Sequence, residues 1–370
     1  MKNYIKKITA ALIILYISTF FFACSADKAE NYPWSNIPAR TVAPQDDLKF
    51  AHNTEMFAID EKPVYFPEFL FALKYVAKHY KRTNGLKKID HWDIKQDELD
   101  LKTYFLTNAV NISFRYHVIE EKAAEFGLSL SEEDLAEMEK RKKKDIEIYG
   151  YGEYIRIVSK MYVSEKMFDY LVKIDRFSAY LFEHLYGKNG KKCTDEDVKN
   201  YVKENDFICA KYIFFPLTDE DGKKVSDEEE KKQLEKIGQI HNELKESDNL
   251  ISAFNVAIRK HNTGIQEENM NAYPNGRLMV SDHLGKKFKK AYLNTKENQI
   301  SKIVRTDEGL YIIMPKPILP QMQIMNGAGT LRQRTAYDYL YKNQIEQWAA
   351  LKKVEYTDAF YLFDIEKHIQ

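Results

Sequence analysis

Apolar positions recur with the period of an α-helix along most of the first half of the chain. Helices are expected to begin where proline or a capping side chain precedes such a run, and to end where glycine follows it. The first predicted element is a hairpin over 56–64 with its turn at Asp60 to Pro63. Four helices are predicted after it: one that begins at Pro67, one from about Asp97 to Phe126, one that begins at Ser131, and one from about Glu153 to Leu185. Residues 56–192 are therefore predicted to form a mostly helical domain.

The pattern changes after Lys192, where strands alternate with shorter helices. Phe207 to Pro216 is a mostly apolar run rich in aromatic side chains, which favours a strand. The other predicted elements are a short helix over Val198–Glu204, a charged helix capped at Ser226 with Leu234, Ile237, Ile240 and Leu244 facing inward, a helix that holds Phe254 and Ile258, part of a helix over Phe288–Leu293, and strands at Ile303–Val304 and Leu310–Met314. This order of strand, helices and two strands predicts a compact α+β domain.

The last part of the chain returns to a helical pattern. Residues 325–330 are interpreted as a linker, because their Gly-x-Gly lacks the third glycine of a dinucleotide-binding loop. A helix is predicted after it over Leu331–Lys353, and a weak strand over Val354–Phe363. The side chains expected along one side of this helix are Leu340, Gln344, Gln347, Trp348 and Leu351.

The N-terminal segment has the pattern of an export signal. Three lysines precede an apolar run from Ile8 to Phe22, which is too short for a transmembrane helix of about 20 apolar residues. Phe21-Phe22-Ala23-Cys24 resembles a bacterial lipobox, in which the cysteine is lipidated and becomes the mature N-terminus. Residues 1–23 are therefore predicted to be a lipoprotein-type signal peptide and residues 24–55 a tether; an uncleaved N-terminal anchor is the alternative. In both cases the body of the protein is expected outside the cytoplasm, in the periplasm or at the cell surface, held at a membrane.

Composition and charge exclude several classes of protein. Lys+Arg and Asp+Glu both total 56, and removing the three lysines of the predicted signal leaves 53 against 56, a net charge of −3. This balance argues against a protein that coats nucleic acid. Hydrophobic residues at 44% and aromatic residues at 13% exclude a disordered chain. The nine histidines are scattered without ligand spacing and no Walker loop occurs, so neither a metal site, nor a nucleotide, nor another cofactor is predicted.

Two other features are interpreted as structural. The basic run Lys140 to Lys144 is expected to be a solvated helix face, with a nucleic-acid patch as the alternative. If Cys24 is lipidated, Cys193 and Cys209 remain, and they are interpreted as unpaired, although pairing is possible in an oxidising compartment.

A family resemblance becomes visible in the α+β region. Gln299 to Ile313 resembles the closing motif of parvulin-type peptidyl-prolyl isomerases, I-S-x-x-V-x-T-x-x-G-x-H-I-I. Ala210 to Phe214 is similar to the opening strand of that family, A-x-H-I-L, and Leu284 to Phe288 is similar to its M-x-x-x-F, which lines the proline pocket. The closing motif has six residues in register: Ser301, Val304, Thr306, Gly309, Ile312 and Ile313.

The resemblance covers about residues 205–318 and, more loosely, the whole chain, which resembles SurA- and PrsA-type foldases. It implies an α+β protein with a mostly helical N-terminal chaperone domain over 56–192. A parvulin-like α+β domain is inserted over 193–320, and a C-terminal helix within 325–370 packs back on the N-terminal domain and completes it.

Departures from the family pattern bear on catalysis. Both family histidines are tyrosine, at Tyr212 and Tyr311, and Leu284 replaces the methionine. Rotation about an X–Pro bond meets a barrier of roughly 18–20 kcal/mol, and the paired histidines of parvulins form a buried hydrogen-bonded platform beneath the twisted amide. Tyrosine replaces some of these hydrogen bonds but not the tautomer pair. With Leu284 and Phe288 keeping an apolar pocket, the expectation is a proline-binding groove with weak or absent isomerase activity, although packing alone also accounts for these residues.

The predicted function is that of a membrane-tethered extracytoplasmic chaperone or foldase that binds unfolded or newly exported polypeptides. Without an ATP motif, binding and release must depend on affinity alone. Two alternatives remain open: an active peptidyl-prolyl isomerase, and a non-catalytic surface lipoprotein with a fixed partner.

Overall fold

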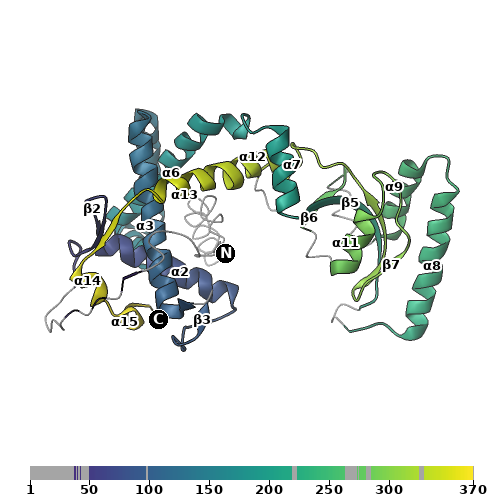
Figure 1. Ribbon diagram of the computed structural model, residues 1–370, viewed down its shortest axis with the longest axis horizontal. Coiled ribbons are helices and arrows are strands. Elements are labelled where there is room, and N and C mark those ends of the chain that lie inside the picture. The colour runs from purple at the N-terminus through teal and green to yellow at the C-terminus, as the bar shows by residue number, and fades with distance from the viewer. Residues whose placement is uncertain are drawn as a thin grey trace. The chain divides into compact units, whose positions relative to one another are not determined.

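Helices and three small sheets make up an α+β fold, as predicted (Figure 1). The computed structural model describes residues 37, 38, 40, 42, 50–96, 99–218, 223–262, 273, 275–280, 285–324 and 329–369. The chain divides into a first unit, which contains the residues up to Lys188 and from Tyr337 onward, and a second unit, Asn189–Ala336. The predicted signal peptide, Cys24 and most of the predicted tether lie outside the described residues. Within the described residues, no helix has the length and apolar character that a membrane crossing requires.

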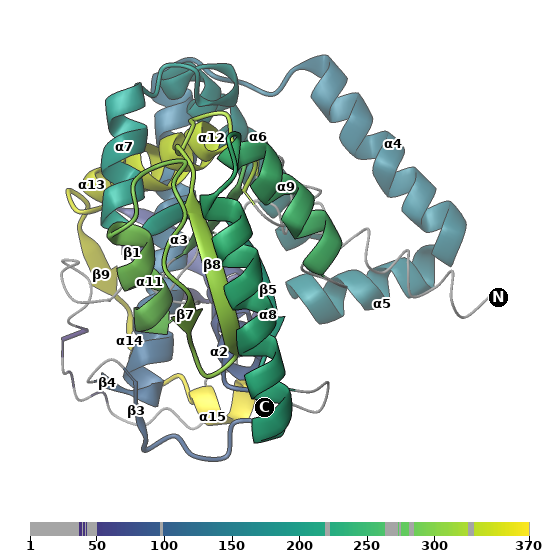
Figure 2. The same cartoon turned by 90° about the vertical axis from the view of Figure 1, so that its right-hand side faces the viewer.

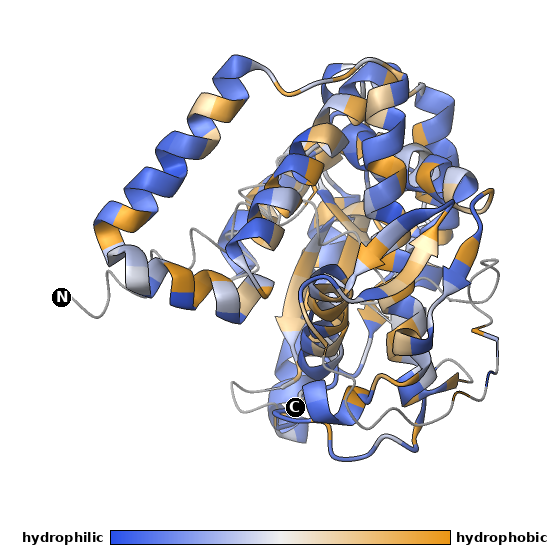
Figure 3. Cartoon of the chain, turned by 90° about the vertical axis from the view of Figure 1, so that its left-hand side faces the viewer, coloured by the Kyte–Doolittle hydropathy of each residue, from blue (hydrophilic) through white to orange (hydrophobic). Residues whose placement is uncertain are grey.

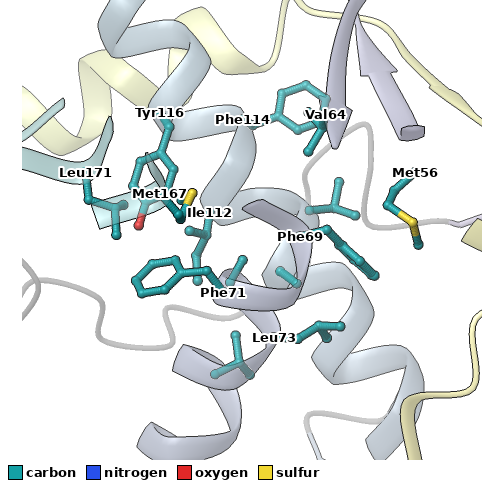
Figure 4. Packing of buried hydrophobic residues seen from close by; sticks show 14 of the residues in the cluster. Met56, Val64, Phe69, Phe71, Leu73, Ile112, Phe114, Tyr116, Met167 and Leu171 are labelled. Atoms are coloured by element: carbon teal, nitrogen blue, oxygen red, sulfur yellow. The ribbon is translucent and has the colours of Figure 1, made fainter. Parts of the chain in front are cut away.

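Helices dominate the first unit, and a small sheet joins its two chain segments. Its elements are β1 (Glu55–Ile59), β2 (Lys62–Tyr65), α2 (Phe66–Thr83), β3 (Lys95–Gln96), β4 (Leu99–Asp100), α3 (Leu101–Glu125), α4 (Glu132–Tyr149), α5 (Tyr151–Tyr162), α6 (Glu165–Tyr186), η4 (Ala336–Lys342, whose first residue belongs to the second unit), α13 (Asn343–Ala349), β9 (Val354–Tyr356), α14 (Asp358–Tyr361) and α15 (Ile365–His368). The predicted hairpin forms as β1 and β2, and its turn residues Asp60 and Glu61 have φ angles of 45° and 67°. Apolar side chains of α2, α3 and α6 point toward one another in the core, among them Phe71, Ile112 and Leu171 (Figure 4).

The C-terminal segment completes the first unit. Strand β9 pairs antiparallel with β1, and α13 packs against α3. Three polar contacts fix this junction: the Lys353 backbone N–H donates to Asp60 Oδ1 at 2.8 Å, and the Lys352 ammonium pairs with both Asp60 and Glu121. Residues far apart in the sequence therefore share one core.

Two helix boundaries in the first unit differ from the prediction. Helix α3 begins at Leu101 rather than near Asp97, because the Asp100 side chain accepts a hydrogen bond from the Thr103 N–H and caps the helix there. The single helix expected over 153–185 is wrong. It is two helices, α5 and α6, separated at Val163, which has a φ of 71°, and Ser164, whose hydroxyl caps α6.

The C-terminal helix also presents a different face from the one predicted. The segment η4 is a π-helix, which has more residues per turn than an α-helix and therefore rotates the residues that follow it. After residue 340 the buried side chains of this segment are Tyr341, Ile345 and Ala349, spaced by four residues. Leu351, expected on the same side as Trp348, is 82% exposed, and the side chain of Leu340 lies outside the described ones.

The second unit is a four-stranded sheet in the order β6-β5-β8-β7, covered by helices. Its elements are η1 (Lys188–Gly190), α7 (Asp195–Glu204), β5 (Phe207–Pro216), α8 (Asp227–Lys245), α9 (Leu250–His261), β6 (Arg277–Val280), α11 (Gly285–Leu293), β7 (Val304–Arg305), β8 (Gly309–Pro315) and α12 (Leu331–Thr335). Figure 2 shows α11 on one side of β8, and α8 and α9 on the other. Strand β5 has the predicted bounds. Helix α8 buries Ile237, Ile240 and Leu244 as expected, but Leu234 is 48% exposed.

Candidate functional site

The two tyrosines at the family histidine positions lie on neighbouring strands. Tyr212 of β5 is opposite Ile313 of β8, and Phe214 is opposite Tyr311. Because opposite residues and those two positions along share one face of a sheet, Tyr212 and Tyr311 are diagonal neighbours on the same face. The strand pairing alone therefore brings together the two residues that the sequence motif singled out.

Helix α11 adds a third ring to this face. The Phe288 ring centroid is 5.2 Å from that of Tyr311 and 6.0 Å from that of Tyr212, with interplanar angles of 89° and 88°. The two tyrosine rings are 5.8 Å apart at 69°. All three pairs have the edge-to-face geometry that aromatic quadrupoles favour. We call Tyr212, Phe288 and Tyr311 the aromatic cluster.

The aromatic cluster is closed to solvent. Tyr212 is 2% exposed, Tyr311 5% and Phe288 0%. A proline ring meets Phe288 only after α11 or a tyrosine ring moves, so a binding role for Phe288 stays a prediction. Leu284, the other residue predicted to line the pocket, lies outside the described residues.

Electrostatics keep both phenols protonated at neutral pH. Burial raises the pKa of Tyr212, although Arg277, whose Nη1 donates to Tyr212 Oη at 3.3 Å, opposes that shift. Burial also raises the pKa of Tyr311, and the Glu308 carboxylate adds to the shift. Neutral phenols at these positions donate and accept hydrogen bonds, but they do not exchange a proton between two ring nitrogens as a histidine pair does.

Three residues of the closing motif have structural roles. The Ser301 hydroxyl accepts from the Ile313 N–H at 3.0 Å and donates to the Lys302 carbonyl at 2.7 Å. The Thr306 hydroxyl accepts from the Gly309 N–H at 3.2 Å and closes the turn between β7 and β8. A side chain at Gly309 would collide with the Phe215 carbonyl oxygen on the adjacent strand. The motif therefore encodes the sheet on which the tyrosines sit.

Sequence reasoning missed a buried asparagine that supports Tyr212. Asn262 is 2% exposed; its Nδ2 donates to the Tyr212 carbonyl at 3.0 Å, and its Oδ1 accepts from the Phe214 N–H at 3.1 Å. The pairing of β6 with β5 ends at Ala210, so the Asn262 amide takes the place of the next strand. Periodicity carried no signal for it, because Asn262 follows the end of α9.

A buried histidine supports the same sheet from α8. His241 is 8% exposed, and its Nε2 lies 3.0 Å from the Ser301 carbonyl oxygen. Burial lowers the pKa of His241, so the neutral ring donates this hydrogen bond at neutral pH.

The two cysteines among the described residues offer no reactive thiol. Cys193 and Cys209 are both free and buried, which confirms that they are unpaired. Burial raises the pKa of Cys193 to about 11 and that of Cys209 to about 12, so neither forms a thiolate near neutral pH. Across the part of the chain that the structure describes, no three His, Cys, Asp or Glu side chains are grouped to hold a metal ion.

The first unit exposes apolar side chains on α4 and α5. Leu135 and Ile148 are each 49% exposed, and Tyr151 is 60% exposed. The two helices extend to one side of the other helices of this unit, and Figure 3 shows apolar residues along α5 (Figures 2 and 3). The basic run on α4 is mostly exposed, but Lys142 is half-buried and pairs with Glu165 of α6 at 2.8 Å.

A second exposed apolar area lies at the end of α3 and α13. Phe126 is 37% exposed and Leu351 82% exposed. Trp348 lies between these helices, with its ring 6.4 Å from that of Phe126 and the Lys122 ammonium 5.3 Å from its ring centre. Together with α4 and α5, these side chains offer apolar contact area at separate places on the first unit.

Comparison with known proteins finds similarity only among solved structures. No family model and no curated protein matches the chain. The foldase protein PrsA from Streptococcus pneumoniae is 13% identical, with 65% of this chain and 82% of that chain covered and a TM-score of 0.22. PrsA from Bacillus subtilis is 20% identical over 71% of this chain and 89% of that chain, with a TM-score of 0.25. The foldase protein PrsA from Lactococcus lactis is 10% identical over 86% of this chain and all of that chain, with a TM-score of 0.31.

Proposed function

We propose that the protein is an extracytoplasmic chaperone or foldase, tethered to a membrane through Cys24, whose parvulin-like unit has lost isomerase activity. Its clients are unfolded or newly exported polypeptides, and its cycle uses neither nucleotide nor metal. The helical unit, completed by the C-terminal segment, is the main client-binding part.

The aromatic cluster carries the proposal on catalysis. Where the parvulin resemblance places two histidines beneath a twisted amide, Tyr212 and Tyr311 pack edge to face with Phe288 and are buried. Neutral phenols do not exchange a proton between two ring nitrogens as a histidine pair does, and Phe288, which would line the proline pocket, is fully covered. Both observations favour a role of the three rings in the core of the second unit.

The exposed apolar side chains of the first unit support the chaperone role. Apolar burial is non-directional, so a surface that includes Leu135, Ile148 and Tyr151 accepts many client sequences. The other exposed apolar area of this unit contains Phe126 and Leu351. Two separate areas suit an extended client that contacts the protein at more than one point.

A pair of assays on the purified full-length protein in detergent tests the proposal. The first follows isomerisation of a short X–Pro peptide and of a protein whose refolding is limited by proline. The second follows aggregation of an unfolded client. We expect no acceleration of isomerisation and clear suppression of aggregation. The variants are Phe288→Ala and, as a matched control, Leu293→Ala, which truncates a 67% exposed residue of the same helix.

Other results would identify the alternatives. Isomerase activity that is lost in Phe288→Ala and retained in Leu293→Ala would contradict the proposal and show an active peptidyl-prolyl isomerase. Absence of both activities, with binding to a single partner, would favour a surface lipoprotein of fixed specificity. Hydrogen exchange of β5 and β8 in each variant shows whether a lost activity reflects the pocket or the unfolding of the second unit.

A further inference from the structure

The face of the sheet opposite the aromatic cluster contains a buried charge. Lys211 follows Ala210 on β5, and because successive strand residues point to opposite faces, its side chain lies on the other face from Tyr212. Lys211 is 6% exposed, and its ammonium donates to Asn255 Oδ1 of α9 at 2.7 Å. Burying an ammonium group is costly unless it has a charged partner.

Two further cations lie beside Lys211. Lys316 directly follows β8, and its backbone N–H donates to the Cys209 carbonyl of β5, so Lys316 lies opposite Cys209. Because Cys209 and Lys211 are two residues apart on β5, Lys316 is the diagonal neighbour of Lys211 on the same face of the sheet. Arg259 is four residues after Asn255 on α9, so it lies one helical turn further along the same side of that helix. We call Lys211, Arg259 and Lys316 the cation cluster.

Lys211 and Lys316 have amide partners, and within the part of the chain that the structure describes the cation cluster has no carboxylate partner. The Lys316 ammonium donates to Asn298 Oδ1 at 2.7 Å, and Asn298 Nδ2 in turn donates to Glu297 Oε1 at 3.2 Å. Among the described residues, no Asp or Glu forms an ion pair with any of the three cations. Glu297 is the one nearby carboxylate that raises the pKa of Lys316, and it is exposed.

The charges act on one another across the face. Burial lowers the pKa of Lys211, and Lys316 and Arg259 lower it further. Burial also lowers the pKa of Lys316. An anion placed among the three groups would remove this repulsion and supply the missing acceptor for the Lys211 ammonium.

We propose that the cation cluster is a binding site for an oxyanion, a carboxylate or phosphate group, reached from the side of the exposed Arg259. The guanidinium and the Lys316 ammonium hold the anion from the solvent side, and Lys211 holds it from within. This site lies on the opposite face of the sheet from the aromatic cluster, so it is independent of the proposed function.

Calorimetric titration of the full-length protein in detergent with inorganic phosphate, at constant ionic strength set by sodium chloride, tests the proposal. We expect saturable binding, and slower hydrogen exchange in β5 and α9 when phosphate is bound. Lys211→Met and Arg259→Gln are each expected to weaken binding about tenfold, the effect of losing one hydrogen bond to a charged group. Lys260→Gln is the matched control, because it removes the same charge from the adjacent exposed position of α9.

The variants separate a built site from general charge attraction. If Lys260→Gln weakens phosphate binding as much as Arg259→Gln does, the proposal is overturned. It is also overturned if the wild-type protein binds neither phosphate nor carboxylates. Arg259 is exposed, so Arg259→Gln keeps the test valid if Lys211→Met fails to fold. A peptide with a free C-terminal carboxylate, compared with its amidated form, shows whether the oxyanion is a peptide terminus or free phosphate.

Discussion

The two faces of the sheet in the second unit stabilise buried polar residues in opposite ways. On one face, two tyrosines are enclosed by aromatic rings, and an arginine N–H reaches the hydroxyl of Tyr212. On the other face, Lys211 is buried beside Lys316 and Arg259, and the one hydrogen-bond acceptor that the described residues give it is an amide. The first face bears the motif that resembles parvulins, and burial keeps its tyrosines neutral at neutral pH. The second bears no motif, and its cations have no carboxylate partner among the described residues, so a motif search alone passes over it.

The largest expected effect comes from opening the aromatic face. Phe288→Ala removes a fully buried ring that contacts both tyrosines, and we expect the free energy of unfolding of the second unit to fall by about 3–5 kcal/mol. Hydrogen exchange of β5 and β8 under denaturant measures this loss. The three tryptophans lie outside residues 189–336, so tryptophan emission follows the first unit separately and should not change.

Leu293→Ala serves as the control for Phe288→Ala on the same helix. Leu293 is 67% exposed, and its truncation should change the free energy of unfolding by less than about 0.5 kcal/mol. Similar effects of the two substitutions would mean that Phe288 is not part of a packed core, and the distinction between the two faces would disappear.

A smaller effect is expected at the turn that aligns the tyrosines. Gly309→Ala places a methyl group against the Phe215 carbonyl oxygen and the Phe214 ring, so the strands must separate locally. We expect a loss of about 1–3 kcal/mol in the stability of the second unit. Urea unfolding followed by tyrosine emission and by hydrogen exchange measures it, with Gly238→Ala as the control because a Cβ there meets no neighbour. No difference between the two variants would contradict the close approach of β5 and β8.

The sequence predicted the fold best where apolar pattern and local capping agree. Strand β5 matches its apolar run, and α4 begins at Glu132, directly after the predicted start Ser131, whose side chain forms a capping box with Asp134. The division between α5 and α6 could not be predicted, because no glycine or proline marks it. Val163 adopts the left-handed conformation within a continuous helical pattern. The π-helical segment η4 was not predicted either, because no local pattern in residues 336–342 distinguishes it from an α-helix.

The candidate site could be located from sequence, but its state could not. Motif register identified Tyr212, Tyr311 and Phe288, and the structure brings the three together. Whether they line an open groove or fill a core depends on the placement of α11, which no local pattern encodes. Lys211 was passed over because one lysine in an apolar strand carries no periodic signal, and Asn262 because its partners are backbone atoms distant in sequence.

Alkaline pH is expected to distinguish the two faces by opposite effects. Burial raises the pKa of Tyr311 above its ordinary value of 10.0, so the unfolded state loses the phenol proton first and the free energy of unfolding falls as pH rises above 10.0. Burial and the neighbouring cations lower the pKa of Lys211 below its ordinary value of 10.5, so the folded state loses the ammonium proton first. The contribution of Lys211 therefore rises with pH until 10.5.

Denaturant unfolding of the second unit across this pH range, in buffers free of phosphate and carboxylate, measures both contributions. Relative to wild type, Tyr311→Phe should gain stability as pH rises above 10.0, because the variant keeps the ring and lacks the titrating hydroxyl. Lys211→Met should lose its relative stability as pH rises toward 10.5, because the wild type no longer buries a charge there. Lys260→Gln removes an exposed positive charge from α9 and is the control for a change of surface charge alone. A Lys211→Met curve that is parallel to wild type would mean that Lys211 keeps an ordinary pKa, and the two faces would then differ in packing but not in charge.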